Sequence, residues 1–323
     1  MTQDSPPAPR IRLIFIIGCT GCGKGALAHE LARRTGAEIV SIDSMKVYRR
    51  MDIGTAKPSP EIRRELPHHL LDVVEPSEEF SVARYVNLAD RAIADIHRRG
   101  RSVLVVGGTP LYIRGLTEGL FEGPGADPAV RDRWLDVARR EGSSALHEQL
   151  ALRDPTSARR IHPNDLRRLV RALEVLDLSG RPISDLQTQW SGQPRRYDCT
   201  FVGLCRRRED QNHRTNQRVH RMLEDGLVEE VQALLDEPAP LSVTARQAVG
   251  YAEIIDYLQG SRSLDAAVEM TKIRTRRLAK AQRTWFQRFR ETVWVDVEPD
   301  AHAASLAEEL LVRFGSLWSL SPK

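Results

Sequence analysis

The sequence has 323 residues, of which 41% are hydrophobic and 28% charged, a composition that is typical of globular proteins and excludes an intrinsically disordered chain. This length suffices for one large α/β domain plus a second unit, and no apolar run approaches the ~20 residues of a membrane span. Residues 1–10 lack the apolar core of a signal peptide, so we expect them to form a disordered tail. Because four cysteines are too few for a disulfide framework in this length, the composition predicts a reducing, cytoplasmic location.

Positive charge is unevenly distributed along the chain, although the formal net charge is only +4. Arginines cluster at residues 159–160, 167–171, 206–208 and 272–290. Such clusters favour a polyanionic partner. Solvated helix faces explain any single cluster about as well, so only their convergence in the fold would decide between the two interpretations.

A glycine-rich loop follows the apolar run at residues 13–17 and precedes a helix-forming stretch at 26–31. The loop consists of Gly18, Cys19, Thr20, Gly21, Cys22, Gly23, Lys24 and Gly25. Strand, glycine-rich loop, lysine and helix form the P-loop arrangement, in which backbone N–H groups and a helix N-terminus bind a di- or triphosphate. Gly25 stands where that motif has the Ser or Thr whose hydroxyl holds magnesium. The loop therefore indicates a diphosphate site more strongly than it indicates metal-dependent nucleotide hydrolysis.

Short apolar runs alternate with helical patterns, which predicts a parallel sheet flanked by helices. The expected strands are residues 11–17, 38–42, 69–74, 102–106, 199–204 and 293–295. From Asp127 to about Ser179 the pattern is helical only, so the chain leaves the sheet and later returns to it. We therefore predict a P-loop NTPase-like α/β core at residues 11–122 and 199–316, with an all-helical insertion at 123–198.

The clearest helix is residues 81–99, with Ser81 as its N-cap and Gly100 as its end. Its expected buried stripe is Val82, Tyr85, Val86, Ala89, Ile93 and Ile96.

A second helix, at about residues 264–290, has two distinct faces. We expect one face to pack on the core: Met270, Ile273, Leu278, Ala281, Trp285 and Phe289. The opposite face is basic: Lys272, Arg276, Lys280, Arg283 and Arg290. Because no acidic residue lies between 271 and 290 to neutralise these charges, we favour a phosphate-contacting surface over an ordinary solvated face.

Two polar residues follow expected strands and should face the same crevice as the P-loop. Asp43 follows the 38–42 run, and Thr109 follows the 102–106 run. Ligand groups in open α/β sheets gather beyond the carboxyl ends of the strands. In this position Asp43 could be a magnesium ligand, a general base or simply the N-cap of a following helix.

The chain also contains an ordered series of unusual strings. The first are Asp-Ser-Met-x-Val-Tyr-Arg at 43–49, Asp-Ile-Gly-Thr-Ala-Lys-Pro at 52–58, Pro-His-His-Leu-x-Asp at 67–72 and Gly-Gly-Thr-x-Leu-Tyr at 107–112. Later ones are residues 160–165 with Arg168, residues 171–174, Arg246 with Gly250 and Tyr251, and residues 275–286. In this order and spacing they resemble the tRNA dimethylallyltransferases (tRNA isopentenyltransferases), and the resemblance covers about residues 11–290.

The resemblance implies transfer of a dimethylallyl group from dimethylallyl diphosphate to the exocyclic N6 amine of the adenine 3′ of the tRNA anticodon, with Mg²⁺ as cofactor. The phosphates bound by the P-loop would then be a leaving group, stabilised by Lys24 and backbone N–H groups. Asp43 would orient the amine and accept its proton, and Thr109 would hydrogen-bond the diphosphate or the amine. Arg214 would clamp phosphate oxygens, although a surface arginine on an amphipathic helix explains it equally well.

The resemblance further implies that the helical insertion and the basic helices grip the anticodon loop, from which the target adenine must leave its stack. The matching tRNA-facing positions are Asp43, Ser44, Met45, Lys46, Thr109, Arg131, Arg167, Arg168, Arg171, Arg246, Gly250, Tyr251, Arg276 and Lys280. We expect a clamp of this size to act as a monomer without a membrane partner.

Four positions depart from the family pattern. Gly25 removes the metal-coordinating hydroxyl, which leaves water or Asp43 to hold magnesium beside the diphosphate. Lys46 replaces a glutamine, while Arg277 and Ala281 replace a glutamine and an arginine. These departures bear on the catalytic rate and on the choice of tRNA.

Three other functions fit part of the pattern: a small-molecule P-loop kinase, an isopentenyltransferase of free adenine nucleotides, and a catalytically silent tRNA-binding protein. The long helical insertion and the basic helix argue against the first two, since a small substrate needs neither. Lys24, Asp43 and Thr109 argue against the third.

The cysteines and paired histidines have simpler explanations than metal binding. A P-loop requires small residues where Cys19 and Cys22 stand, and the spacing of Cys199 and Cys205 does not suit a zinc knuckle. We expect His68 and His69 to pack beside the sheet.

Overall fold

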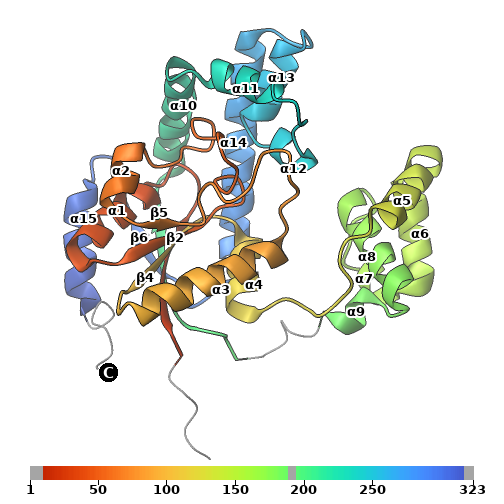
Figure 1. Cartoon of the computed structure of the whole chain (residues 1–323), viewed down its shortest axis with the longest axis horizontal. Coiled ribbons are helices and arrows are strands. Elements are labelled where there is room, and N and C mark those ends of the chain that lie inside the picture. The colour runs from red at the N-terminus through yellow and green to blue at the C-terminus, as the bar shows by residue number, and fades with distance from the viewer. Residues whose placement is uncertain (1–9, 188–193, 316–323) are drawn as a thin grey trace, which may run out of the picture. The chain divides into compact units, whose positions relative to one another are not determined.

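The computed structural model describes residues 10–187 and 194–315, so the expected tail at 1–10 lies outside the described residues except for Arg10. The fold is a sheet flanked by helices (Figure 1). The sheet has six strands, all parallel, in the order β3-β2-β4-β1-β5-β6. The strands are β1 (Arg12–Gly18), β2 (Glu38–Ile42), β3 (His68–His69), β4 (Val103–Gly107), β5 (Asp198–Cys205) and β6 (Val293–Asp296). The predicted parallel sheet flanked by helices is confirmed.

Helices occupy most of the remaining chain. Those before β5 are α1 (Lys24–Thr35), α2 (Pro60–Glu65), α3 (Val82–Arg98), α4 (Pro110–Glu118), α5 (Pro128–Glu141), α6 (Ser143–Arg153), α7 (Pro155–Ala158), α8 (Leu166–Ser179) and α9 (Ile183–Leu186). Those after β5 are α10 (Arg208–Glu224), α11 (Leu227–Leu235), α12 (Val243–Arg246), α13 (Tyr251–Leu258), α14 (Leu264–Phe286) and α15 (Ala303–Arg313).

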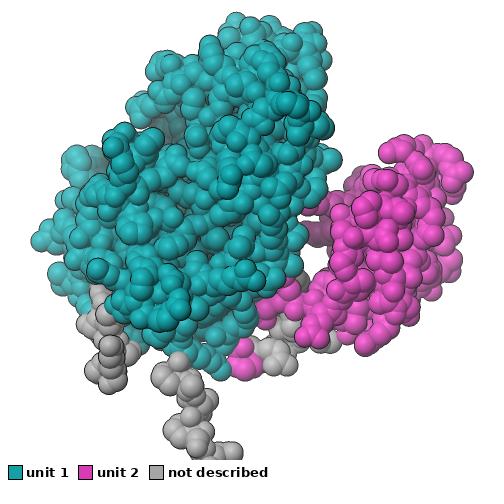
Figure 2. All heavy atoms as spheres, in the orientation of Figure 1, with its two compact units in different colours: residues 1–117, 195–323 teal, residues 118–194 magenta. Residues whose placement is uncertain are grey.

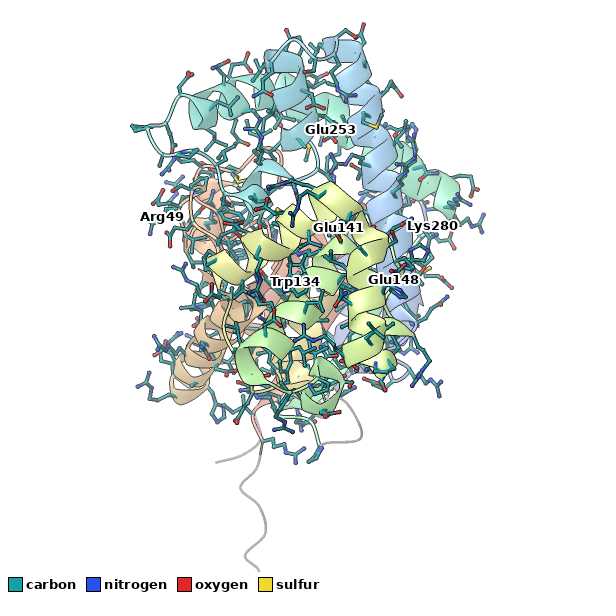
Figure 3. All side chains as sticks on the ribbon, turned by 90° about the vertical axis from the view of Figure 1, so that its right-hand side faces the viewer. Arg49, Trp134, Glu141, Glu148, Glu253 and Lys280 are labelled. Atoms are coloured by element: carbon teal, nitrogen blue, oxygen red, sulfur yellow. The ribbon has the colours of Figure 1, made fainter. Side chains whose placement is uncertain are left out.

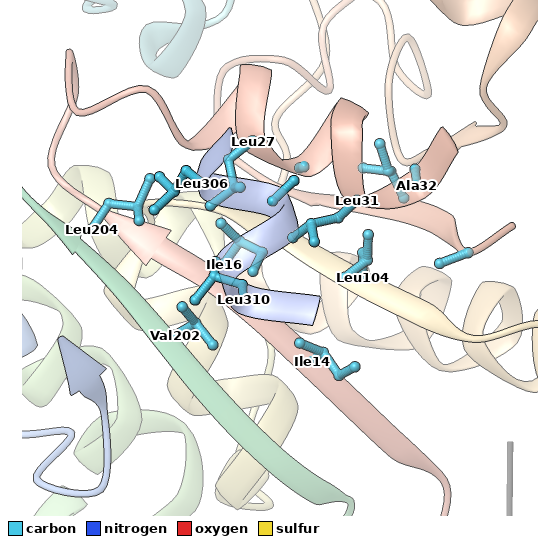
Figure 4. Packing of buried hydrophobic residues seen from close by; sticks show 14 of the residues in the cluster. Ile14, Ile16, Leu27, Leu31, Ala32, Leu104, Val202, Leu204, Leu306 and Leu310 are labelled. Carbon is cyan, nitrogen blue, oxygen red and sulfur yellow. The ribbon is translucent and has the colours of Figure 1, made fainter. Parts of the chain in front are cut away.

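Strand β1 is apolar from Leu13 to Ile17 because both faces of the sheet are covered. Ile14 and Ile16 point to the face on which α1 and α15 pack, where they meet Leu27, Leu31 and Leu310 (Figure 4). Side chains alternate along a strand, so Phe15 points to the other face and stacks on Phe201 of β5 at 4.5 Å between ring centroids. The sheet thus holds the P-loop at the end of a strand that is buried on both sides.

Two expected elements illustrate where local pattern succeeds and fails. Helix α3 has the predicted N-cap, because the Ser81 hydroxyl accepts a hydrogen bond from the Arg84 N–H at 3.2 Å. The expected strand at 69–74 is wrong in length, since β3 ends at His69. Leu70 and Asp72 have φ angles of 64° and 54°, a left-handed backbone that cannot continue a strand.

The chain divides into two compact units, residues 1–117 with 195–323 and residues 118–194 (Figure 2). The sheet belongs to the first. The second contains only helices among its described residues, and a small apolar core holds them together: Leu146, Leu150, Leu169, Leu173 and Ile183, with Trp134 packed against it (Figure 3). Neither unit has, in residues 10–187 and 194–315, a helix long and apolar enough to cross a membrane.

Candidate functional site

A cavity of about 590 Å³ lies beyond the carboxyl ends of β1, β2 and β4, within the sheet-containing unit. The P-loop, residues 43–46 and residues 106–110 line one side of it, and residues of α10, α13 and α14 line the other. Asp43, Thr109 and Lys24 therefore meet in one cavity, as the strand order predicts.

The P-loop has the backbone that a phosphate cradle requires. Gly21 and Gly23 have φ angles of 84° and 98°, and an ideal Cβ on Gly21 would lie 3.0 Å from the Thr215 hydroxyl. Helix α1 then begins at Lys24 without a side-chain cap, so its first N–H groups are available to an anion. Within residues 10–187 and 194–315 the Lys24 ammonium makes only a long hydrogen bond, 3.3 Å, to the Cys19 carbonyl.

Two glutamines from distant helices fix the P-loop. The Gln282 side chain of α14 accepts from the Thr20 N–H at 2.8 Å and donates to the Gly108 carbonyl at 2.7 Å, which joins the loop to the end of β4. Gln211 of α10 donates to the Thr20 carbonyl at 2.7 Å. In the sequence Gln282 stands out only as part of the 275–286 motif, and no local pattern marks Gln211.

Asp43 lies where β2 ends, and no helix follows it: residues 44–50 form turns and an isolated bridge. Its Oδ1 accepts from the Met45 N–H at 2.9 Å and from the Lys46 N–H at 3.4 Å. The helix N-cap interpretation is therefore wrong, because the carboxylate closes a turn through one oxygen. Among the described residues Oδ2 has no hydrogen-bond partner, so it is available to a ligand.

Thr109 supports the Asp43 turn. Its hydroxyl oxygen accepts from the Ser44 N–H at 3.1 Å, and its own N–H donates to the Ile42 carbonyl at 3.3 Å. The hydroxyl proton remains for a ligand in the cavity.

Three cationic side chains and one carboxylate line the cavity in the described part of the chain: Lys24, Lys46, Arg218 and Asp43. The Arg218 guanidinium donates to the Thr20 hydroxyl at 3.3 Å. Burial lowers the pKa of Lys46 to about 8, even though the neighbouring Asp43 charge raises it. The three cations are half-buried and outnumber the one carboxylate, and this excess of positive charge favours a multivalent anion.

Arg214 is exposed and does not line the cavity, whereas Arg218, four residues later on α10, does. The spacing of four puts both arginines near the same helix face, so the sequence does not distinguish them. In the structure the Arg218 guanidinium reaches the Thr20 hydroxyl of the P-loop, and Arg214 is exposed.

The far side of the cavity carries a group of apolar side chains beside Arg218 and the polar residues of the same elements. The apolar ones come from α10, the segment before α13, and α14: Val219, Met222, Val249, Leu278 and Trp285. A wall of this kind suits a hydrocarbon tail attached to the anion.

These contacts correct the expected faces of α14. Leu278 is 42% exposed and, with Ala281 and Trp285, faces the cavity, while Ala279, Gln282 and Phe286 are buried. The helix begins and ends near the predicted bounds, but the predicted core face is wrong over this stretch. The apolar stripe faces the cavity because α10 covers the neighbouring face.

The predicted basic face of α14 is also not one continuous surface. Arg276 donates to Asn216 and Arg283 to Gln211, both on α10, and the buried Lys272 pairs with Glu269. Lys280 is exposed (Figure 3).

At the rim of the cavity the loop at residues 52–54 is joined to helices α11 and α13. One carboxylate, Glu230 of α11, accepts from the N–H groups of Asp52, Ile53 and Gly54 and from the Tyr251 hydroxyl. An ideal Cβ on Gly54 would lie 2.4 Å from the Tyr251 ring, so only glycine fits there. Tyr251 is fully buried and positions this rim rather than presenting its hydroxyl to a ligand.

Gly250 and Arg246 flank the same rim. Gly250 lines the cavity at a φ of 96°, and its N–H donates to the Glu253 carboxylate at 2.8 Å (Glu253 is labelled in Figure 3). Arg246 is exposed at the end of α12 and donates to Gln259 at 3.3 Å.

The remaining predicted tRNA-facing arginines lie in the helical unit and fall into two groups. Arg131 and Arg171 both pair with the fully buried Glu174. Arg167 and Arg168 are exposed at the start of α8, and Arg168 pairs with Asp165 at 3.3 Å.

The cysteines are all free, with Cys19 and Cys22 buried in the P-loop. His69 pairs with the buried Glu38, and His68 meets His29 at 3.3 Å, so both histidines are half-buried beside the sheet edge. No group of three or more Cys, His, Asp or Glu residues within the described ranges could hold a metal ion.

The donor set of the cavity does not fit a magnesium ion held by the protein. Mg²⁺ requires near-octahedral oxygen ligands, and P-loop proteins supply a Ser or Thr hydroxyl where this chain has Gly25. Among the described residues Asp43 offers a single uncommitted oxygen, and the positive charge of Lys46, which lines the same cavity, opposes a second cation there.

Comparisons with known proteins identify the family of the chain. A family model described as IPP transferase matches residues 46–289, and one described as isopentenyl transferase matches residues 10–72. The tRNA dimethylallyltransferase of Geobacter metallireducens is 50% identical over 287 residues, which are 89% of this chain and 93% of that protein. That of Geobacillus thermodenitrificans is 43% identical over 301 residues, 92% of this chain and 94% of that protein.

Solved structures give the same assignment. The tRNA isopentenylpyrophosphate transferase from Bacillus halodurans superposes with a TM-score of 0.70 at 37% identity, over 95% of this chain and 96% of that one. A eukaryotic dimethylallyltransferase acting on tRNA superposes with a TM-score of 0.78 at 28% identity, over 97% and 81%. The chain therefore belongs to the IPP transferase family, the family of the tRNA dimethylallyltransferases.

Proposed function

We propose that this enzyme transfers the dimethylallyl group of dimethylallyl diphosphate to the exocyclic N6 amine of the adenine 3′ of the anticodon in tRNA. One observation supports this most strongly. A single cavity joins a P-loop and three cations to an apolar wall and to one carboxylate with an available oxygen. A diphosphate, a prenyl tail and a nucleophile that must lose a proton each find a matching surface there.

The P-loop side binds the leaving group. As the bond between the allylic carbon and the diphosphate oxygen breaks, negative charge grows on the diphosphate. The α1 N-terminus, Lys24 and Arg218 stabilise that charge where it develops. The apolar wall around Trp285 holds the prenyl tail and excludes water, which would otherwise capture the allylic cation.

The carboxylate side serves the nucleophile. The adenine amine attacks the allylic carbon, and the new C–N bond leaves a proton on nitrogen that Oδ2 of Asp43 accepts. Oδ1 is held by the Met45 N–H, so the carboxylate is oriented before the substrate arrives. Thr109 supports the same turn through Ser44.

Magnesium enters this proposal only as a counter-ion that accompanies the diphosphate in solution. The target adenine must leave its stack to reach a cavity of this kind, which requires contacts to the anticodon loop. We propose the exposed Arg167, Arg168, Arg246 and Lys280 for those contacts, and a monomeric enzyme acting in the cytoplasm.

The test is an assay of purified protein with labelled dimethylallyl diphosphate, magnesium and unmodified tRNA. We expect one labelled adenine, next to the anticodon on its 3′ side. Binding of tRNA without incorporation would instead indicate a silent tRNA-binding protein. Labelling of free adenine nucleotides, or transfer of a phosphoryl group, would indicate the two small-molecule alternatives.

A further inference from the structure

The P-loop of this chain has open space where a metal-binding hydroxyl would stand. An ideal Cβ on Gly25 would meet no heavy atom within 4 Å, and Gly25 lines the cavity. The glycine is therefore not required by crowding. Its φ angle is not in the left-handed region either, since Gly25 is the second residue of α1.

Lys46 lines the same cavity as Gly25. Its charge acts on Asp43, on Lys24 directly before Gly25, and on His29 one turn after it. Its backbone N–H is fixed by Asp43 Oδ1, so the side chain starts from a defined turn.

The Lys46 ammonium has no partner of its own. In the described ranges it makes no hydrogen bond and no ion pair, although it is desolvated enough to lower its pKa. Lys57 shows the alternative, because its buried ammonium pairs with both Asp52 and Asp72. Removing a cation from water costs free energy, and a bound anion offsets that cost.

We propose that Lys46 binds the non-bridging oxygens of the diphosphate and takes over the charge neutralisation that a protein-held magnesium ion performs in hydroxyl-containing P-loops. This rests on the proposed function for the identity of the anion. A diphosphate is multiply charged, so Lys24 and Arg218 alone leave charge that a third cation offsets. The enzyme consequently binds diphosphate without magnesium.

The test measures binding of inorganic diphosphate to the full-length protein by calorimetry, in EDTA and in magnesium. We expect the unmodified enzyme to bind in EDTA, Lys46→Gln to bind about tenfold to a hundredfold more weakly there, and Lys46→Arg to retain most of the affinity. Adding Gly25→Ser to Lys46→Gln should recover affinity in magnesium but not in EDTA. Arg91→Gln is the matched control, since Arg91 is exposed on α3 and does not line the cavity.

Unchanged diphosphate affinity of folded Lys46→Gln in EDTA would overturn the proposal. Unchanged diphosphate affinity together with weaker tRNA binding would assign Lys46 to the anticodon loop instead. Thermal unfolding of each variant separates lost binding from lost folding. If the unmodified enzyme fails to prenylate any tRNA, the proposed function fails, while the diphosphate measurement still judges Lys46.

Discussion

The basic residues of the helical unit and those of the cavity differ in what they face. In the helical unit Arg131 and Arg171 converge on Glu174, which is completely buried and also accepts from the Asp127 N–H. These arginines therefore hold α5, α8 and the segment before α5 together.

In the cavity, by contrast, cationic side chains outnumber carboxylates. Lys24, Lys46 and Arg218 line a cavity that has one carboxylate among the described residues, and one oxygen of that carboxylate is committed to backbone N–H groups. The basic residues of the chain thus fall into two groups with different roles. A cation that forms an ion pair with a buried carboxylate stabilises the fold, whereas a partly buried cation without such a partner can bind an anionic ligand.

The largest expected effect concerns the only acidic side chain that lines the cavity among the described residues. Asp43→Asn should lower prenyl transfer about 10²–10⁴-fold, because the amide cannot accept the proton. Diphosphate affinity should stay equal or rise, since a negative charge has been removed. Single-turnover kinetics and diphosphate calorimetry measure the two effects, and weaker diphosphate binding would contradict the assignment.

A change at Glu174 tests whether Arg131 and Arg171 stabilise the helical unit. Glu174→Gln should destabilise the helical unit by about 2–3 kcal/mol, because two half-exposed arginines and one N–H lose a charged acceptor. Hydrogen exchange of residues 118–194 should quicken while diphosphate affinity stays unchanged. An unaltered exchange rate would show that Glu174 does not organise this unit.

The same carboxylate predicts a pH dependence. Burial raises the pKa of Glu174, but Arg171, the Asp127 N–H and Arg131 outweigh it, and the net shift is downward. The folded state then binds this proton less readily than the unfolded state, so the contribution to stability is complete above the ordinary glutamate pKa of about 4.3 and is lost as the pH falls through the lowered value. Denaturation of the unmodified protein and Glu174→Gln should therefore converge in acid, and a constant difference would refute the linkage.

Two arginines of α10 form a matched pair, because Arg218 lines the cavity and Arg214 does not. Arg218→Gln should weaken binding of the prenyl diphosphate about tenfold to a hundredfold, because a cation inside the cavity is lost. Arg214→Gln removes the same charge four residues away and should have little effect. The Michaelis constant for dimethylallyl diphosphate checks both, and equal losses would show that Arg214 reaches the substrate.

The smallest expected effect is at the rim. Tyr251→Phe removes one hydrogen bond to Glu230 and leaves the three N–H donors of residues 52–54 in place. Activity should fall only a few-fold, corresponding to about 1 kcal/mol. Kinetics with tRNA as the varied substrate measure this, and a loss above about a hundredfold would give the hydroxyl a direct role.

The sequence by itself determined the P-loop, the alternation that makes a parallel sheet, the meeting of Asp43 with Thr109, and the family. These follow from local patterns, because strand, turn and helix signals act over a few residues, and parallel strands end at one edge. A prediction that is wrong also came from a local pattern. The strand at 69–74 fails because the backbone of Leu70 and Asp72 is left-handed, which apolar content does not reveal.

Only the tertiary structure decided which side chains enter the cavity. A helical period divides α14 into faces but does not say that α10 covers one of them, so Leu278 and Trp285 line the cavity. Nor does the helical period show that Arg131 forms an ion pair with Glu174, which lies 43 residues further along the chain. The charge state of a site depends on such distant partners, and packing alone brings them together.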